Sequence, residues 1–191
     1  MKLILLRHGE TEWNLNGRMQ GLSDTRLTAA GLGQARQATA RMPAFAQIWT
    51  SPLQRARLTA KVIADEQGSQ CTVDDRLIER SWGEWEGMLP EEVDREWPGW
   101  RAEGRKPPGY ERDELVFARF RAWLADVSAV GLQGPVAAVT HGGFMSAVVR
   151  VLGGTGTGYK NLEGVWLTDD QGRLRIARHE EFIRGARRLA R

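Results

Sequence analysis

Cysteine is almost absent from this sequence. Cys71 is the single cysteine among 191 residues, so the chain cannot form an intramolecular disulfide. A disulfide framework of the kind found in small secreted domains is therefore excluded. A chain of this length buries a substantial core without such cross-links, and one free thiol is compatible with a reducing compartment.

Long apolar runs are absent as well. The apolar run from Leu3 to Leu6 is ended by Arg7, and we identify neither a signal peptide nor a stretch long enough to cross a bilayer. We therefore expect a soluble, cytoplasmic protein with no membrane partner.

Lysine is scarce. Only four of the 27 cationic residues are lysines, so the other 23 are arginines, against 24 acidic residues and a net charge of +3. A basic surface for nucleic acid is one interpretation. The arginines are scattered, however, and only the tail at 184–191 is strongly basic. We therefore expect an ordinary charged surface with no nucleic-acid partner, and a preference for anionic small molecules.

Histidine is rare too, yet two of the three histidines occupy similar places. His8 follows a predicted strand over 3–6, and His141 follows another over 135–140. Arg7 lies beside His8, and glycines follow both histidines. Arginine offers a rigid fork of donors that matches phosphate oxygens, and neutral imidazole is nucleophilic near pH 7. This pattern favours chemistry on a phosphoryl group.

The hydrophobic periodicity alternates between strands and helices. We predict strands over 3–6, 46–49, 71–73, 135–140, 163–168 and 174–179, and helices over 29–41, 53–67, 90–97, 111–130 and 144–152. Such alternation is typical of an α/β fold with a mostly parallel central sheet covered on both faces. We expect one domain over 1–191, with its core at about 1–76 and 131–191 and a helical insertion at about 77–130 beside the active site.

Ligands of open α/β sheets bind at the carboxyl ends of the strands. The segments that end at Arg55 and begin at His141 follow predicted strands, as the Arg7-His8 pair does. Because the carboxyl ends of parallel strands meet at one edge, we expect these two arginines and two histidines to surround one pocket.

The ordered set of motifs resembles the histidine phosphatase superfamily, the phosphoglycerate mutase-like proteins. The motifs that carry this resemblance are Arg7-His8-Gly9-Glu10-Thr11-Glu12-Trp13-Asn14, Gln20-Gly21-Leu22-Ser23-Asp24, Ser51-Pro52-Leu53-Gln54-Arg55-Ala56, Glu79, Gly83-Glu84-Trp85-Glu86-Gly87 and Thr140-His141-Gly142-Gly143. They cover nearly the whole chain in the family's order. The resemblance implies a three-layer α/β/α sandwich.

The resemblance also implies a role for each motif residue. His8 is expected to be the nucleophile, Arg7 and Arg55 the phosphate clamp, His141 a further ligand of the transferring group, and Glu79 the general acid and base. The neighbouring Glu84 and Glu86 are alternatives to Glu79. Asn14, Gln20, Gly21 and Gly142 are expected to bind substrate, and neither a metal nor a cofactor is expected.

The expected function is hydrolysis of small phosphate monoesters through a phosphohistidine. A phosphoglycerate mutase is one alternative. Mutases of the family that need a bisphosphoglycerate primer carry a longer insertion, whereas Glu79 and His141 are only 62 positions apart (141 − 79). A non-catalytic domain that binds phosphorylated ligands or a protein partner is the alternative from another class. The sequence leaves the physiological substrate and the oligomeric state open.

Overall fold

The molecule is built on one six-stranded sheet. The computed structural model describes residues 1–156, 158–170 and 172–183, so the basic tail at 184–191 lies outside the described residues. The strands are β1 (Lys2–Arg7), β2 (Gln47–Thr50), β3 (Cys71–Val73), β4 (Val136–Thr140), β5 (Glu163–Asp170) and β6 (Arg173–Glu181), in the order β3-β2-β4-β1-β5-β6. Strands β1 to β4 pair in parallel, and β5 runs antiparallel to both of its neighbours. The predicted mostly parallel sheet is confirmed.

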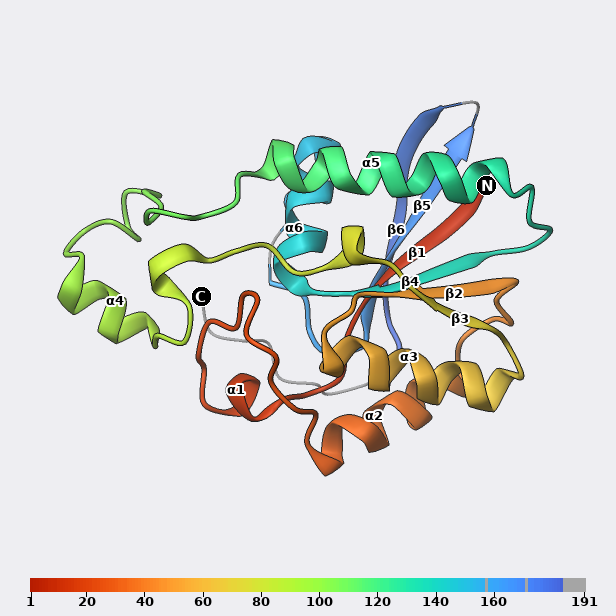
Figure 1. The fold of residues 1–191 in the computed structure, drawn as a ribbon, viewed down its shortest axis with the longest axis horizontal. Coiled ribbons are helices and arrows are strands. Elements are labelled where there is room, and N and C mark those ends of the chain that lie inside the picture. The colour runs from red at the N-terminus through yellow and green to blue at the C-terminus, as the bar shows by residue number, and fades with distance from the viewer. Residues whose placement is uncertain (157, 171, 184–191) are drawn as a thin grey trace.

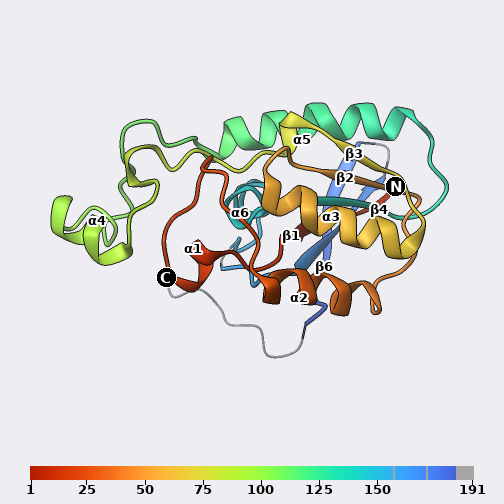
Figure 2. The same ribbon diagram turned by 60° about the horizontal axis from the view of Figure 1, so that its bottom comes forward.

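Helices cover both faces of this sheet (Figures 1 and 2). One face carries α2 (Ala29–Thr39) and α3 (Gln54–Gln67), and the other carries α5 (Asp113–Ala129) and α6 (Gly142–Val151). The remaining short elements are α1 (Glu12–Leu15), α4 (Pro90–Glu96) and 3₁₀ turns at Asp75–Leu77 and Gly83–Trp85. The three-layer α/β/α sandwich is therefore confirmed.

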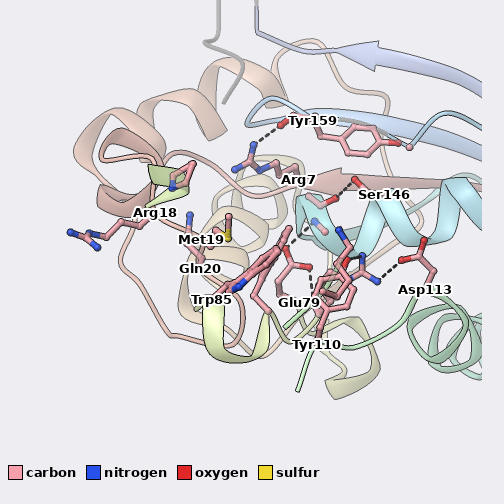
Figure 3. Close-up of a pocket in the computed structure, with 18 of the residues that line it drawn as sticks. Arg7, Arg18, Met19, Gln20, Glu79, Trp85, Tyr110, Asp113, Ser146 and Tyr159 are labelled. Atoms are coloured by element: carbon pink, nitrogen blue, oxygen red, sulfur yellow. Dashed lines mark hydrogen bonds and ion pairs between the residues drawn. The ribbon is translucent and has the colours of Figure 1, made fainter. Parts of the chain in front are cut away.

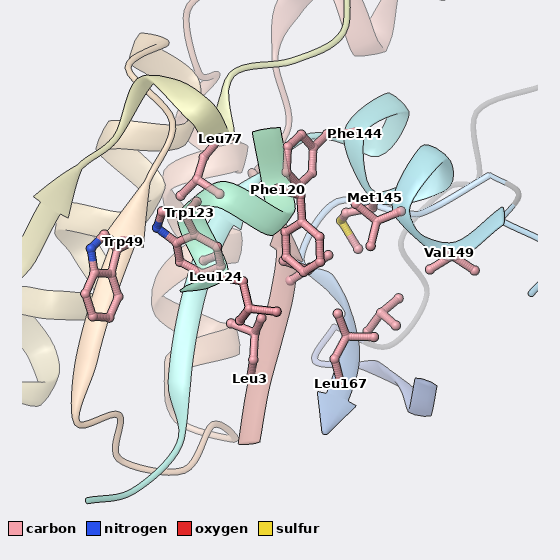
Figure 4. Close-up of a cluster of buried hydrophobic side chains, with 14 of the residues drawn as sticks. Leu3, Trp49, Leu77, Phe120, Trp123, Leu124, Phe144, Met145, Val149 and Leu167 are labelled. Carbon is pink, nitrogen blue, oxygen red and sulfur yellow. The ribbon is translucent and has the colours of Figure 1, made fainter. Parts of the chain in front are cut away.

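Strand β1 shows why the sequence folds into three layers. Its side chains alternate, because successive residues of a strand point to opposite faces. Leu3 and Leu5 join the core under α5 and α6, where they share a cluster with Phe120 (Figure 4). Ile4 and Leu6 join the core under α2 and α3. Full burial of each such side chain contributes roughly 1.5–3 kcal/mol.

The range 77–130 contains two kinds of structure. Helix α5 buries one stripe of side chains against the sheet layer, and these are Val116, Phe120, Trp123, Leu124 and Val127. The part before it, including α4, extends away from the sheet (Figure 1). The division into core and insertion remains a prediction, but α5 packs as a layer of the sandwich.

The segment 10–28, which lies between β1 and α2, contains the four-residue helix α1. The Thr11 hydroxyl accepts a hydrogen bond from the Asn14 amide, and the Asn14 side chain accepts one from the Thr11 amide. This reciprocal capping box stabilises a helix too short to show a hydrophobic period.

Among the described residues, no helix has both the length and the apolar character that a membrane crossing requires.

Candidate active site

The carboxyl ends of β1, β2 and β4 bring the two strand-end histidines together. The rings of His8 and His141 have centroids 5.2 Å apart, and both side chains are buried. The turn after β1 requires glycine, because a Cβ on Gly9 would lie 2.6 Å from the backbone oxygen of Gly31. The parallel register of the strands thus places the predicted pair at one edge of the sheet.

The imidazole of His8 is fixed in one tautomer by its backbone partner. Its Nδ1 lies 2.6 Å from the carbonyl oxygen of Gly9. A carbonyl only accepts hydrogen bonds, so Nδ1 carries the proton and Nε2 keeps its lone pair. Burial first, and then the charges of Arg55 and Arg7, hold the pKa of His8 well below 6.5. His8 is therefore neutral at pH 7, with Nε2 as its nucleophilic atom.

Arg7 lines the cavity as a fixed positive charge. Its Nη1 donates to the carbonyl oxygen of Tyr159, which fixes the guanidinium. Its buried Nε has no hydrogen-bond partner within the part of the chain that the structure describes. Burial lowers the pKa of Arg7 to about 10, so the side chain stays charged at neutral pH. A buried N–H without a partner is costly.

Arg55 is fully buried and is held by three acceptors. Its Nη1 donates to the Ser23 carbonyl oxygen at 2.6 Å and its Nη2 to the Gly21 carbonyl oxygen at 2.8 Å. Its Nε donates to Nδ1 of His141 at 3.2 Å. Burial lowers the pKa of Arg55 to about 10, which still leaves it charged. Arg55 lies near the start of α3, where the helix dipole is unfavourable for a cation. Its side chain instead lines the cavity.

His141 is engaged on both ring nitrogens. Because Nδ1 accepts from Arg55, the proton lies on Nε2, which donates to the Ser51 hydroxyl at 2.7 Å. Burial, followed by the charge of Arg55, holds the pKa of His141 well below 6.5. His141 does not line the cavity that His8 lines. In this arrangement it contacts Arg55, and its expected role as a direct phosphate ligand stays a prediction.

The Glu79 carboxylate accepts three backbone hydrogen bonds. The amides of Arg80 and Phe144 donate to Oε1 at 2.8 and 2.7 Å, and the amide of Gly143 donates to Oε2 at 3.0 Å. Two of these amides belong to the first turn of α6, where unpaired N–H groups favour a carboxylate. Since each carboxylate oxygen has two acceptor positions, Oε2 keeps one position for a proton.

The two alternative acids lie elsewhere. Glu84 is exposed and does not line the cavity. Glu86 accepts hydrogen bonds from the amide and the hydroxyl of Ser23 at 2.5 and 2.7 Å, and it too is outside the cavity. Of the three carboxylates, only Glu79 lines the cavity that His8 also lines.

The four residues expected to bind substrate are placed in two ways. Asn14, Gln20 and Gly142 line the cavity. The Asn14 side-chain oxygen accepts from Thr11 and Asn161, so its amide nitrogen is the group left for a ligand. Gly21 does not line the cavity, and its carbonyl oxygen accepts a hydrogen bond from Arg55.

One cavity of about 1040 Å³ contains these groups (Figure 3). Its lining is strongly cationic, with eight positive side chains against three carboxylates, those of Glu79, Asp113 and Glu114. The eight are Arg7, Arg18, Arg55, Arg80, Arg101, Lys106, Arg112 and Arg150. Such a lining raises the local concentration of anions.

Several lining residues were missed by the sequence analysis. Arg80, Lys106, Tyr110, Asp113 and Arg150 come from the insertion, α5 and α6, and no motif marks them. Trp82 and Trp85 also line the cavity.

Asn161 was missed for a different reason. It lies just before β5, and its side-chain nitrogen donates to the His8 carbonyl oxygen at 2.9 Å and to the Asn14 side-chain oxygen at 3.0 Å. Asn161 and His8 are 153 positions apart in the sequence, and only the tertiary fold brings them into contact.

Comparisons with known proteins agree with this geometry. A family model of the histidine phosphatase superfamily (branch 1) matches residues 3–180. The glucosyl-3-phosphoglycerate phosphatase of Mycolicibacterium vanbaalenii is 37% identical over 166 residues, covering 79% of this chain and 73% of that protein. The probable phosphoglycerate mutase GpmB of an Enterobacter species is 36% identical over 161 residues, covering 80% and 74%. A solved mycobacterial glucosyl-3-phosphoglycerate phosphatase in complex with VO3 superposes with a TM-score of 0.81 at 31% identity, covering 92% and 96%.

Proposed function

Because this chain belongs to the histidine phosphatase superfamily, we propose that it is a phosphomonoesterase that transfers the phosphoryl group to His8. One observation carries the proposal. The Nδ1–H of His8 is committed to the Gly9 carbonyl, so Nε2 is an unprotonated nucleophile in a cavity that Arg7 and Arg55 also line.

In the first step, Nε2 of His8 attacks the phosphorus atom and the bond to the alcohol oxygen breaks. Negative charge spreads over the equatorial oxygens, so catalysis consists mainly of positioning and charge stabilisation. Arg7 and Arg55 supply two fixed positive charges. The related phosphatase solved with VO3 binds a group whose composition parallels that of PO3, which supports a site of this kind here.

Glu79 is the proton donor in this proposal. A proton on the remaining acceptor position of Oε2 leaves the three amide hydrogen bonds intact. The proton passes to the departing alkoxide, and the resulting carboxylate takes a proton from the water that attacks the phosphohistidine. Inorganic phosphate leaves, and both residues return to their starting states.

The proposed reaction needs no metal ion, because the two arginines supply the charge that a cation would otherwise provide. Hydrolysis should therefore continue in excess EDTA at an unchanged rate. A cytoplasmic location belongs to the same proposal and is supported by the single cysteine.

The deciding experiment compares wild type with His8→Ala, using phosphate release from p-nitrophenyl phosphate. We expect a loss of at least about 10³-fold, since the nucleophile is removed. The exposed histidine offers a matched control. The ring of His179 stacks on Tyr159 but does not line the cavity, so His179→Ala should keep most of the activity. Acid quenching should destroy a phosphoenzyme that alkali preserves, as a P–N bond requires. Equal activity of wild type and His8→Ala would refute the mechanism.

A phosphoglycerate mutase is the second candidate, supported by the likeness to GpmB. A mutase returns the phosphoryl group of His8 to the bound product, whereas a phosphatase gives it to water. Incubation with 3-phosphoglycerate separates them. Inorganic phosphate with no 2-phosphoglycerate supports hydrolysis, and isomerisation faster than phosphate release supports the mutase.

A further inference from the structure

The backbone peptide that joins His8 to Gly9 is held from two sides of the fold. Its carbonyl oxygen, which belongs to His8, accepts a hydrogen bond from the Asn161 side-chain nitrogen at 2.9 Å. Its amide, which belongs to Gly9, donates to the Thr59 hydroxyl at 3.0 Å. Asn161 lies just before β5 and Thr59 lies in α3, so two separate segments fix this one peptide.

The hydroxyl of Thr59 is fully buried and acts both as a donor and as an acceptor. Its Oγ1 donates to the Arg55 carbonyl oxygen at 2.7 Å, a bond that threonine commonly forms to the preceding turn of a helix. A hydroxyl has a single proton, so this bond leaves the lone pairs of Oγ1 free to accept from the Gly9 amide. The hydroxyl therefore connects the backbone of Arg55 to the turn that follows His8.

Gly9 in turn orients the imidazole of His8. The His8 Nδ1–H donates to the Gly9 carbonyl oxygen at 2.6 Å, and the amide of the same glycine is the group that Thr59 holds. Glycine has no side chain that could be anchored, and its backbone torsions are permissive. Without the Thr59 contact, rotation at Gly9 would move the carbonyl, and the His8 ring would move with it.

Resting on the proposed function, we propose that Thr59 is a positioning residue whose hydroxyl sets the direction in which Nε2 of His8 meets the phosphorus atom. Thr59 is not among the described residues that line the cavity, so it acts through Gly9 and not on the substrate. A displacement of about 1 Å at a reacting centre costs about 100-fold in rate, so a small rotation of the ring is sufficient to slow the transfer.

A purely structural role for Thr59 gives a different expectation. Loss of a buried hydroxyl that bonds within a helix would lower the melting temperature and leave the kinetics unchanged. Thr39 is the matched control, because it is also buried and its hydroxyl donates to the Ala35 carbonyl oxygen, four residues earlier in α2, at 2.8 Å. The difference between the two threonines isolates the contact with Gly9.

The experiment measures kcat/KM for p-nitrophenyl phosphate and the inhibition constant of inorganic phosphate. Valine has the shape of threonine without the hydroxyl, and Thr59→Val should lower kcat/KM by roughly 10- to 100-fold. The inhibition constant should stay nearly unchanged, because the Arg55 side chain keeps its contacts to Ser23, Gly21 and His141. Thr39→Val should keep the wild-type value of both constants.

Two conservative variants test the hydroxyl itself. Thr59→Ser keeps the hydroxyl and should retain most of the wild-type kcat/KM. Thr59→Cys carries a thiol, which is a weak acceptor, and should lower kcat/KM below that of Thr59→Ser. Melting temperatures show which variants are folded, and the comparison of serine with cysteine supplies the test if Thr59→Val does not fold.

A double variant shows whether Thr59 acts through His8. In a His8→Ala background, Thr59→Val should not reduce the residual hydrolysis further, because no imidazole remains to be oriented. A wild-type kcat/KM in folded Thr59→Val, an equal loss in Thr39→Val, or a further loss in the double variant would overturn the positioning role and leave the phosphatase standing. Full activity of His8→Ala would overturn the phosphatase instead.

Discussion

Acidification from pH 7 to pH 5 should destabilise this protein through two buried histidines. His8 and His141 have folded-state pKa values well below 6.5, chiefly because burial disfavours their charged forms. An unfolded chain exposes both imidazoles, which then titrate near 6.5. Below that pH the unfolded state binds more protons than the folded state. Stability is therefore complete above about pH 6.5 and falls as the pH drops.

The size of the effect follows from the proton count. For one group that titrates at 6.5 when unfolded and stays neutral when folded, lowering the pH from 7 to 5 removes about 2 kcal/mol. His8 and His141 together should remove at most about 4 kcal/mol, the limit for two imidazoles that take up no proton in the folded state, which is a large share of the 5–15 kcal/mol typical of a folded domain. Asp113, whose pKa is lowered to about 2, loses its contribution only at lower pH.

Urea unfolding at pH 7, 6 and 5 in phosphate-free buffer measures this loss directly. His8→Gln and His141→Gln should each reduce it by about half, from about 4 to about 2 kcal/mol. His179→Gln serves as the control, because His179 is exposed and should leave the loss unchanged. A free energy of unfolding that stays constant between pH 7 and pH 5 would show that the reasoning is wrong.

Three substitutions test other parts of the structure. Gly143→Ala should lower kcat by about tenfold or more, because the added Cβ would lie 2.8 Å from the Glu79 Oε1 atom and 2.9 Å from Arg80 Cδ. Steady-state kinetics measure this loss, and a wild-type kcat would contradict the prediction. Asn161→Ala should lower kcat by about tenfold and change KM less, because the hydrogen bonds that hold the His8 backbone and the Asn14 side chain are lost. A lower melting temperature with an unchanged kcat would indicate a merely structural role. Phe120→Ala should cost about 3–5 kcal/mol in urea unfolding, because this fully buried ring packs on three other aromatic residues. A loss below 1 kcal/mol would contradict the packing.

The layers of the fold could be predicted because burial alternates along the strands. The predicted strand over 135–140 and helix over 53–67 agree with β4 and α3 to within about one residue at each end. Helix α1 could not be found by period, since four residues make barely one turn. The capping box of α1 consists of Thr11 and Asn14. Threonine and asparagine also form side-chain hydrogen bonds to the backbone in turns, so this pair does not by itself predict a helix.

The meeting of the strand-end residues was predictable for a topological reason. Once β1, β2 and β4 are parallel neighbours, the residues that follow them must share an edge. Glu79 follows no strand directly, and its expected role as the acid came from the family resemblance. Asn161 could not be found at all, since its hydrogen bonds to His8 and Asn14 join segments that meet only in the folded chain.

The way the side chains are held explains why motifs reveal so much of this site. The Gly9 carbonyl orients His8, three amides hold Glu79, and the carbonyls of Gly21 and Ser23 hold Arg55. Backbone partners are present whatever the neighbouring side chains are, so the geometry is set before a phosphate arrives, and little reorganisation is needed during transfer.

The same reasoning separates arginine from lysine at position 55. A single ammonium could not span two carbonyls and the His141 ring, whereas the planar fork of Arg55 does so and keeps N–H groups for the phosphoryl oxygens.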